Sequence, residues 1–228
     1  MGALDSAPGG FSGSEGSPIA ILVDDDTEVR DSLEELLNSV GIESISFSST
    51  QEVLDAELPD RPACLVLDVR MPGLSGLDLH HLLLTKGIQT PVVFLTGHGD
   101  IAMSVQAMKA GAVDFLTKPV RDQTFLDAIS AAVAADIARR AAATVSRKTM
   151  ALYETLTPRE REVLRFVVSG AMNKQIAFDL GISEITVKLH RSNMMKKMNA
   201  RSLTHLLNAW QSLPAEMRRT PLEVRLSL

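Results

Sequence analysis

Short apolar runs recur along the first half of the chain, and each ends at polar or turn-forming residues. Runs of four to eight apolar residues bounded by turn signals are typical of strands that are buried on both faces of a sheet. The pattern therefore predicts five strands, over residues 19–23, 44–47, 63–67, 91–95 and 113–116.

Amphipathic stretches separate these runs. They predict helices over residues 27–40, 51–57, 77–85 and 100–110, and a long one from about 122 towards 150. Thr27 and Ser49 are the expected N-caps of the first two helices, and Gly41 is expected to end the first. Strands that alternate with helices form right-handed βαβ units. We therefore expect an α/β fold with a doubly wound, five-stranded parallel sheet.

Beyond residue 150 the pattern is helical throughout. Thr157, Pro158 and Glu160 supply a cap, a first helical position and a capping-box acid. Further helices are predicted over residues 174–180, 184–198 and 201–213, with a tight turn at 181–183. Helix, short glycine-containing turn and helix are the layout of a helix-turn-helix, so we expect a small all-α domain. The apolar residues expected to hold its two helices together are Ile176, Ala177, Leu180, Ile182, Ile185, Val187, Met194 and Met198.

The formal charge of −5 conceals an asymmetry between the two parts of the chain. Residues 1–148 carry a net charge of −10, whereas residues 149–228 carry +5. An acidic part joined to a basic part suggests a regulatory module attached to a nucleic-acid-binding module. The expected organisation is a disordered tail (1–18), the sheet domain (19–135), a helical linker (136–152), the helix-turn-helix domain (153–213) and a C-terminal tail (214–228).

The composition also bears on the compartment. Cys64 is the only cysteine, which excludes an intramolecular disulfide framework and fits a reducing cytoplasm. Residues 1–18 lack the basic and apolar regions of a signal peptide, and no apolar run approaches the roughly 20 residues that span a bilayer. We therefore expect a cytoplasmic protein with no membrane partner.

Acidic, hydroxyl and basic side chains directly follow four of the predicted strands. Asp24 and Asp25 follow the first, Asp68 the third, Thr96 the fourth and Lys118 the fifth. Parallel strands end at one edge of the sheet, where α/β proteins bind their ligands. Crowded carboxylates need a cation, and oxygen ligands suit Mg²⁺ or the similar Mn²⁺. With a metal to neutralise it, a phosphoryl group could be accepted by Asp68, hydrogen-bonded by Thr96 and paired with Lys118.

Two other interpretations account for parts of this pattern. An acidic cluster after a strand is often only a helix cap, and this is the expected role of Asp26. Aspartate-nucleophile phosphatases also form an aspartyl-phosphate at a strand end, but they carry an acid/base aspartate two residues later. Here that position is Arg70, so a switch is favoured over a hydrolase, and we expect no enzyme beyond self-phosphorylation and self-dephosphorylation at Asp68.

Residues 19 to about 135 resemble the receiver domain of two-component response regulators. The matching stretches are 22–26, 67–73, 94–100 and 107–119. The resemblance implies phosphotransfer from a sensor histidine kinase to Asp68. It also implies a metal held by Asp25, Asp68 and the backbone carbonyl of Arg70, with Asp24 acting mainly through water.

The same resemblance implies how the phosphate would be sensed. Thr96 follows the phosphoryl group, and the aromatic side chain at Phe115 changes rotamer with it. The family often has Tyr at this position; because Phe cannot hydrogen-bond there, the switch would rest on packing. The Lys118–Pro119 peptide is expected to be cis, and Arg70 and His98 would flank the site and tune hydrolysis. For His98, an exposed loop histidine without such a role is an equal alternative.

The C-terminal part resembles the LuxR-type helix-turn-helix, and the pairing resembles the FixJ/NarL class. The exposed basic side of the second helix suits the major groove of DNA. By resemblance, Lys188, Leu189 and Ser192 are base-edge positions. Residues better suited to backbone contacts are Lys174, Thr186, His190, Arg191, Lys196 and Lys197. For His190, filling the groove between helices is an equal alternative.

These features predict a phosphorylation-activated transcription factor. Phosphorylation of Asp68 would promote homodimerisation and binding to double-stranded promoter DNA, with RNA polymerase as a possible further partner. The alternative is a non-canonical regulator, whose interactions or DNA binding do not depend on phosphate. The intact acceptor site argues against this alternative.

Overall fold

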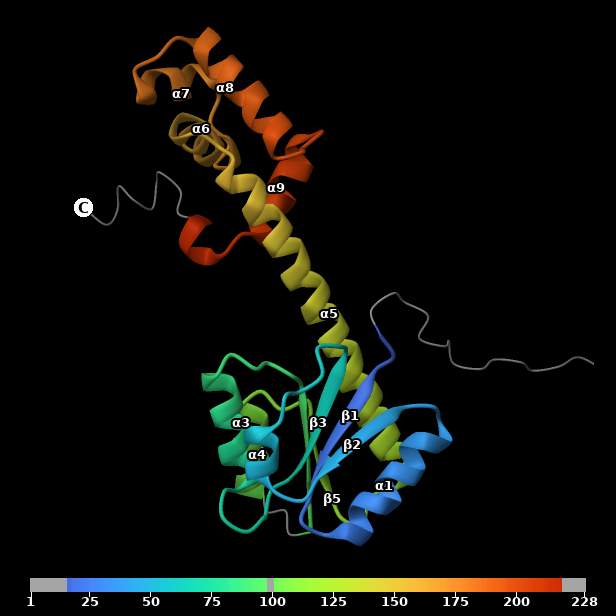
Figure 1. Ribbon diagram of the computed structural model, residues 1–228. Helices are drawn as coiled ribbons and strands as arrows, with labels where there is room; N and C mark the ends of the chain where they lie inside the picture. The colour runs from blue at the N-terminus through green and yellow to red at the C-terminus, as the bar shows by residue number, and fades with distance from the viewer. Residues whose placement is uncertain (1–15, 98–100, 219–228) are drawn as a thin grey trace, which may run out of the picture. The chain divides into compact units, whose positions relative to one another are not determined.

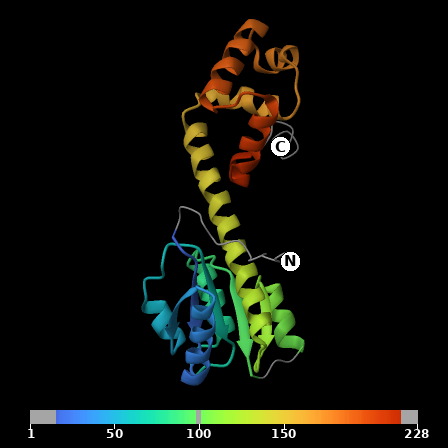
Figure 2. The ribbon, with the colours of Figure 1, turned by 90° about the vertical axis from the view of Figure 1, so that its right-hand side faces the viewer.

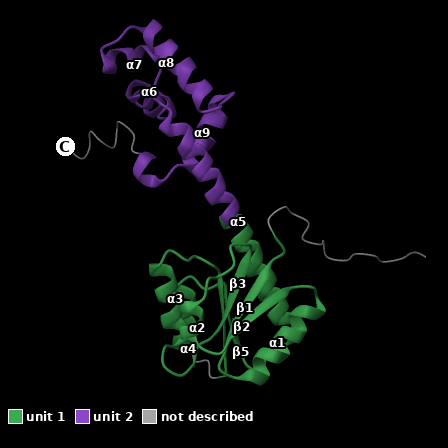
Figure 3. Ribbon diagram, viewed as in Figure 1, with its two compact units in different colours: residues 1–139 green, residues 140–228 purple. Residues whose placement is uncertain are grey.

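The computed structural model describes residues 16–97 and 101–218. The chain forms two compact units, residues 1–139 and 140–228 (Figure 3). The predicted tails over residues 1–18 and 214–228 lie mostly outside the described residues, and only 16–18 and 214–218 of them are described. Ala215–Arg218 forms a single 3₁₀ turn.

The first unit is built on a five-stranded, fully parallel sheet. Its strands are β1 (Ile19–Val23), β2 (Glu43–Phe47), β3 (Ala63–Asp68), β4 (Val92–Thr96) and β5 (Asp114–Thr117). Their order is β2-β1-β3-β4-β5, with the crossovers of a doubly wound fold. The predicted α/β architecture is confirmed, with strand bounds that differ from the prediction by one residue at most.

Helices cover both faces of the sheet (Figures 1 and 2). On one face lie α2 (Thr50–Asp55), α3 (Gly76–Thr85) and α4 (Ile101–Lys109). On the other lie α1 (Thr27–Ser39) and the first part of α5 (Asp122–Glu154). Alternate residues of each inner strand enter the two cores: Leu65 and Leu67 join one, whereas Cys64 and Val66 join the other. Cys64 is thus a fully buried apolar group of the core.

The N-caps predicted for the first two helices have different outcomes. Ser49 caps α2 as predicted, because its hydroxyl accepts from the Glu52 amide. The prediction that Thr27 caps α1 was wrong, since the Asp26 carboxylate accepts from the amides of Glu28 and Val29. Asp26 therefore has the capping role that was expected of it in the acidic cluster.

His80 is a buried polar residue away from the sheet edge. It lies in α3, its ring contacts Phe94 edge-on with centroids 5.8 Å apart, and its Nδ1 has no hydrogen-bond partner among the described residues. Burial, together with the neighbouring His81, lowers the pKa of His80 below the ordinary value of 6.5. The folded first unit therefore holds His80 in its neutral form at a pH where the unfolded chain has begun to bind a proton.

We expect the first unit to lose stability as the pH falls below about 6.5. In that range the unfolded state binds more protons at His80 than the folded state, so the free energy of unfolding falls with pH, down to the depressed folded pKa. Hydrogen exchange of α3 and β4 amides between pH 7 and pH 5 measures this. His80→Phe should remove the dependence, whereas His81→Gln, which removes only the smaller of the two causes, should weaken it much less; equal slopes in all three proteins would contradict the prediction.

The helix α5 continues from the first unit into the second without a break. Within the first unit its Asp136 is fully buried, and the carboxylate accepts a 3.0 Å hydrogen bond from the Ala63 amide at the start of β3. Arg139 donates two hydrogen bonds to the other carboxylate oxygen. Asp136 and Arg139 therefore belong to the packed part of the first unit.

The second unit holds the end of α5 and four further helices. These are α6 (Pro158–Val168), α7 (Asn173–Leu180), α8 (Glu184–Lys197) and α9 (Leu203–Ser212), which surround a core that includes Val163, Ile176, Met194 and Trp210. The predicted capping box of α6 is present, with Thr157 and Glu160 bonded reciprocally. Gly181 adopts a φ of +64° between α7 and α8, which a residue with a side chain rarely accepts.

One predicted core residue of the helix pair was placed wrongly. Ile185 is 79% exposed, whereas Val187, Met194 and Met198 are buried. The buried residues recur at seven and four positions along α8 and so form one stripe. Ile185 lies two positions before Val187, which turns its side chain to the opposite side of the helix.

Candidate functional site

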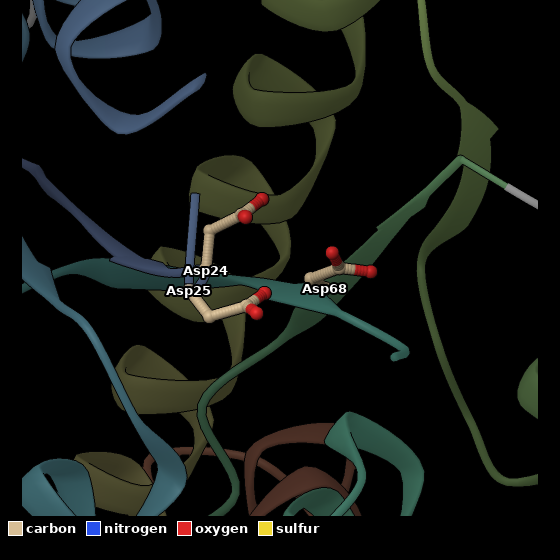
Figure 4. Close-up of side chains that lie close together, drawn as sticks. All are labelled: Asp24, Asp25 and Asp68. Carbon is tan, nitrogen blue, oxygen red and sulfur yellow. The ribbon is translucent and has the colours of Figure 1, made fainter. Parts of the chain in front are cut away.

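The carboxyl ends of β1 and β3 bring three aspartates together. These strands are neighbours in the sheet, and Asp24 and Asp25 leave the end of β1 on the side where Asp68 lies (Figure 4). One carboxylate oxygen from each residue lies within 4.8 Å of the others. Asp24 and Asp68 are buried and Asp25 is exposed, so the cluster is open to solvent on one side. This oxygen-only donor set fits a hard divalent cation.

Lys118 supplies a positive charge to the same cluster. Its Nζ donates to Oδ2 of Asp24 at 2.5 Å and to Oδ2 of Asp68 at 2.9 Å. Burial opposes the charge of Lys118, but the hydrogen bonds to the two carboxylates outweigh it and raise the pKa of the ammonium group. Burial raises the pKa of Asp24 despite its bond to Lys118. The residues from β1, β3 and the end of β5 thus meet as the sequence predicted.

Backbone contacts fix the acidic residues in place. The Asp26 amide donates to Asp24, and the Arg70 amide donates to Oδ1 of Asp68 at 3.1 Å. Sequence reasoning missed two supporting residues. Arg30 donates at 2.7 Å to the carbonyl of Asp24 and so holds the β1–α1 turn. A Cβ added to Gly76 would lie 2.1 Å from the Asp68 carbonyl oxygen, so only glycine lets α3 begin so close to the acceptor strand.

A glycine next to a predicted turn was the available signal for Gly76, but the prediction started that helix one residue later. For Arg30, the signal was a cation at helical spacing after three acids, which the sequence could equally explain as a solvated surface charge.

The residues expected to sense the phosphate lie at the adjoining strand ends. Thr96 is the last residue of β4 and is fully buried, and its carbonyl accepts from the Lys118 amide at 2.8 Å. Phe115 lies on β5 opposite Phe94, half-buried against the core on the α3–α4 side. The predicted cis peptide between Lys118 and Pro119 is confirmed. His98 lies outside the described residues.

The predicted DNA-contact residues of the helix-turn-helix differ in their exposure to solvent. The exposed positions among them are Lys174, Lys188, Leu189, Ser192 and Lys196. Thr186 is half-buried and its hydroxyl lies 2.8 Å from that of Ser183, the α8 cap. His190 is also half-buried.

Two of the predicted cationic contacts have partners inside the domain. Arg191 donates to the Asn173 side chain at 3.2 Å, and Lys197 donates to the buried carboxylate of Glu160 at 2.7 Å. The sequence predicts both to be exposed contacts of α8, and the structure corrects this. The structure gives Lys197 in particular a structural partner, because the Glu160 side chain is only 4% exposed.

Comparison with known protein families matches both units. A response regulator receiver domain model matches residues 20–130, and a model of bacterial regulatory proteins of the luxR family matches residues 154–209. Nodulation protein W of Bradyrhizobium diazoefficiens is 49% identical over 93% of each chain, and FixJ of Azorhizobium caulinodans is 45% identical over 85% of this chain and 91% of its own. The chain belongs to the FixJ/NarL class of response regulators.

Solved structures of response regulators support this assignment. StyR superposes with a TM-score of 0.72 at 45% identity, over 86% of this chain and 99% of its own. Full-length FixJ from B. japonicum gives 0.53 at 37% identity, over 87% and 98%. This response regulator is therefore a phosphorylation-dependent transcription regulator with a DNA-binding C-terminal domain. Among the described residues, no helix has both the length and the apolar character needed to cross a membrane.

Proposed function

We propose that Asp68 accepts a phosphoryl group from a sensor histidine kinase, and that the phosphorylated chain binds promoter DNA as a homodimer. The observation that carries the proposal is the position of Asp68 at the end of β3, beside the acid pair and 2.9 Å from the ammonium group of Lys118. A carboxylate oxygen of Asp68 would attack phosphorus while the bond from phosphorus to the kinase histidine nitrogen breaks. The nitrogen keeps the electron pair, and one proton, carried by the other ring nitrogen or taken up from water, leaves the kinase histidine as neutral imidazole.

The acidic cluster would hold Mg²⁺ or Mn²⁺ during this transfer. Asp25, Asp68 and the backbone carbonyl of Arg70 are the proposed ligands, and Asp24 acts through water. When bound, the cation supplies positive charge that offsets the oxygens of the phosphoryl group. Lys118 provides the complementary charge from the protein, and the Thr96 hydroxyl orients a phosphoryl oxygen. Enzymatic chemistry of the chain would be limited to gaining and losing this phosphate.

Lys118→Met should strengthen divalent-cation binding. The Lys118 ammonium group bonds to Asp68, a proposed ligand, and to Asp24, which would act through water, so its removal leaves a more negative cluster. From the Coulomb energy of a unit charge a few ångströms away, we expect roughly tenfold tighter Mg²⁺ binding or more. Protection of β3 amides from hydrogen exchange during a Mg²⁺ titration measures it. An unchanged titration midpoint would show that the cation does not bind beside Lys118.

We further propose that phosphorylation draws Thr96 inward and lets Phe115 repack. This changes the face made by α4, β5 and the start of α5. On α4 that face carries Ile101 (84% exposed), Val105 (45%) and Met108 (47%) at helical spacing. These apolar side chains are the proposed contact between two phosphorylated copies. In energetic terms the phosphate shifts a population between two states of this face.

In the DNA-bound dimer, α8 would lie in the major groove. Lys188, Leu189 and Ser192 are the proposed base-edge contacts. Backbone contacts would come from Lys174, Thr186, His190, Lys196 and, more weakly, the partnered Arg191. Lys197, which the sequence also assigned to the DNA backbone, is proposed to stay bonded to Glu160 instead. RNA polymerase is a further proposed partner, and a promoter-bound role would place the protein in the cytoplasm.

The domain limits follow as part of the proposal. The sheet domain begins at residue 19, the helix-turn-helix domain extends over 153–213, and tails flank them. The linker predicted over 136–152 is better placed after Arg139, because Asp136 is buried against β3.

Phosphorylation with acetyl phosphate and Mg²⁺ tests the proposal. The phosphorylated chain should have twice the monomer mass in light scattering. It should bind duplexes retained from random DNA roughly 5- to 150-fold more tightly than the unphosphorylated chain, the usual range of allosteric coupling. Affinity should fall steeply with salt if the lysine contacts form. Equal affinities before and after phosphorylation would support the phosphate-independent regulator instead.

A further inference from the structure

The solvent-facing side of α8 begins with two aliphatic side chains. Ile185 is 79% exposed and Leu189 is 58% exposed. Residues four apart on a helix lie one above the other, so the two form one stripe, which the exposed Ser192 and Lys196 continue. Val187, Met194 and Met198 occupy the opposite, buried side.

Packing within the domain does not account for this stripe. A single exposed aliphatic side chain is common and needs no explanation. Here, however, two of them occupy the first turns of the second helix of a helix-turn-helix, the part that meets base edges. The exposed cations Lys188 and Lys196 lie on the same side of α8 and complement the phosphates that border a groove.

We propose that Ile185, together with Leu189, reads the methyl groups of thymines in the major groove. Ile185 thereby becomes a specificity-determining residue beside those already proposed, and the inference rests on the proposed DNA binding of α8. An aliphatic side chain has no donor or acceptor for a base edge. The C5 methyl of thymine is the apolar group that the major groove presents, and it separates thymine from cytosine.

The spacing of the two side chains sets the spacing of the thymines. Four residues rise about 6 Å along a helix, close to two base steps of about 3.4 Å. Each half of the DNA site should therefore hold two thymines, on either strand, within about three base pairs of each other.

Replacing thymine by uracil removes only the methyl group and so tests the contact directly. Duplexes selected by the phosphorylated full-length protein are resynthesised with uracil at one thymine at a time. At two positions per half-site, uracil should weaken binding about fourfold, the factor that corresponds to burying one methylene-sized group. With Ile185→Ala, one of these positions should become indifferent to the methyl group; with Leu189→Ala, the other should.

Phe178→Ala is the matched control, because Phe178 is 88% exposed but lies on α7. It should keep the thymine preference at both positions. The inference is overturned if no thymine responds to uracil, if Ile185→Ala keeps both responses, or if Ile185→Ala abolishes dimerisation without changing any response. If the phosphorylated protein selects no duplex, the proposed function fails together with the inference.

Discussion

Asp68→Asn is expected to reduce phosphoryl labelling of the chain to background. Asparagine preserves the shape of the side chain, but its amide lacks the anionic oxygen that must form the bond to phosphorus. The protein should still fold, since Lys118 keeps its 2.5 Å contact with Asp24 and the β3 core does not change. Intact mass spectrometry after incubation with acetyl phosphate and Mg²⁺ measures the added phosphoryl group.

Asp78→Asn provides the control for this substitution. Asp78 is an exposed aspartate in the first turn of α3, hydrogen-bonded to Ser75. Its replacement should leave phosphoryl labelling at the wild-type level. Labelling that persists in Asp68→Asn would overturn the assignment of the acceptor. Repeated turnover of a small phosphoester by the wild-type protein would instead support the phosphatase interpretation, which Arg70 argues against because it cannot act as a general acid.

The sheet and its acceptor edge could be predicted from the sequence because both depend on local signals. A short apolar run such as 63–67 can bury its side chains only as a central strand, and the first charged residue after it must emerge at the sheet edge. Four strands end in, or directly before, Asp24, Asp68, Thr96 and Lys118, so these residues could be expected at one edge of the sheet without knowledge of the crossovers. The structure brings Asp24, Asp68 and Lys118 together there.

Two stabilising contacts outside the acceptor site could not be predicted because they join residues far apart in sequence. Asp136 meets the Ala63 amide across 73 positions, and Lys197 meets Glu160 across 37. Periodicity identifies which side of a helix is apolar, but not which charged residue at its border turns inward. Periodicity also does not predict the exposure of Ile185, because an isoleucine within a helical pattern is ordinarily assigned to the core.

Lys197→Met should lower the stability of the second unit, whereas Lys196→Met, on the same helix, should leave it nearly unchanged. The Glu160 carboxylate is buried, and it accepts from Lys197 Nζ and from the Thr157 amide. Removing Lys197 leaves that charge without its cation. We expect a loss of about 1 to 3 kcal/mol in the free energy of unfolding, reduced from the value for a fully buried pair because Lys197 is 36% exposed. Lys196→Met, at an exposed position, should change stability by less than about 0.5 kcal/mol.

DNA binding should show the reverse ranking. A lysine that contacts a phosphate contributes about one unit to the dependence of log affinity on log salt. Because both copies of the proposed dimer carry the substitution, Lys196→Met should lower this slope by about two units. Lys197→Met should leave it unchanged, because its ammonium group is already bound to Glu160. The single tryptophan, Trp210, is buried in the second unit, so its fluorescence during urea unfolding reports the stability of that unit.

A Glu160→Gln background separates the ion pair from other effects of losing Lys197. Glutamine can still accept from the Thr157 amide, so the capping box is retained while the buried charge is removed. Lys197→Met should then cost less than about 0.5 kcal/mol, and the difference between the two backgrounds measures the coupling of the pair. If Lys197→Met lowers the salt slope and costs the same in both backgrounds, Lys197 is a phosphate contact, and its bond to Glu160 gives way when DNA binds.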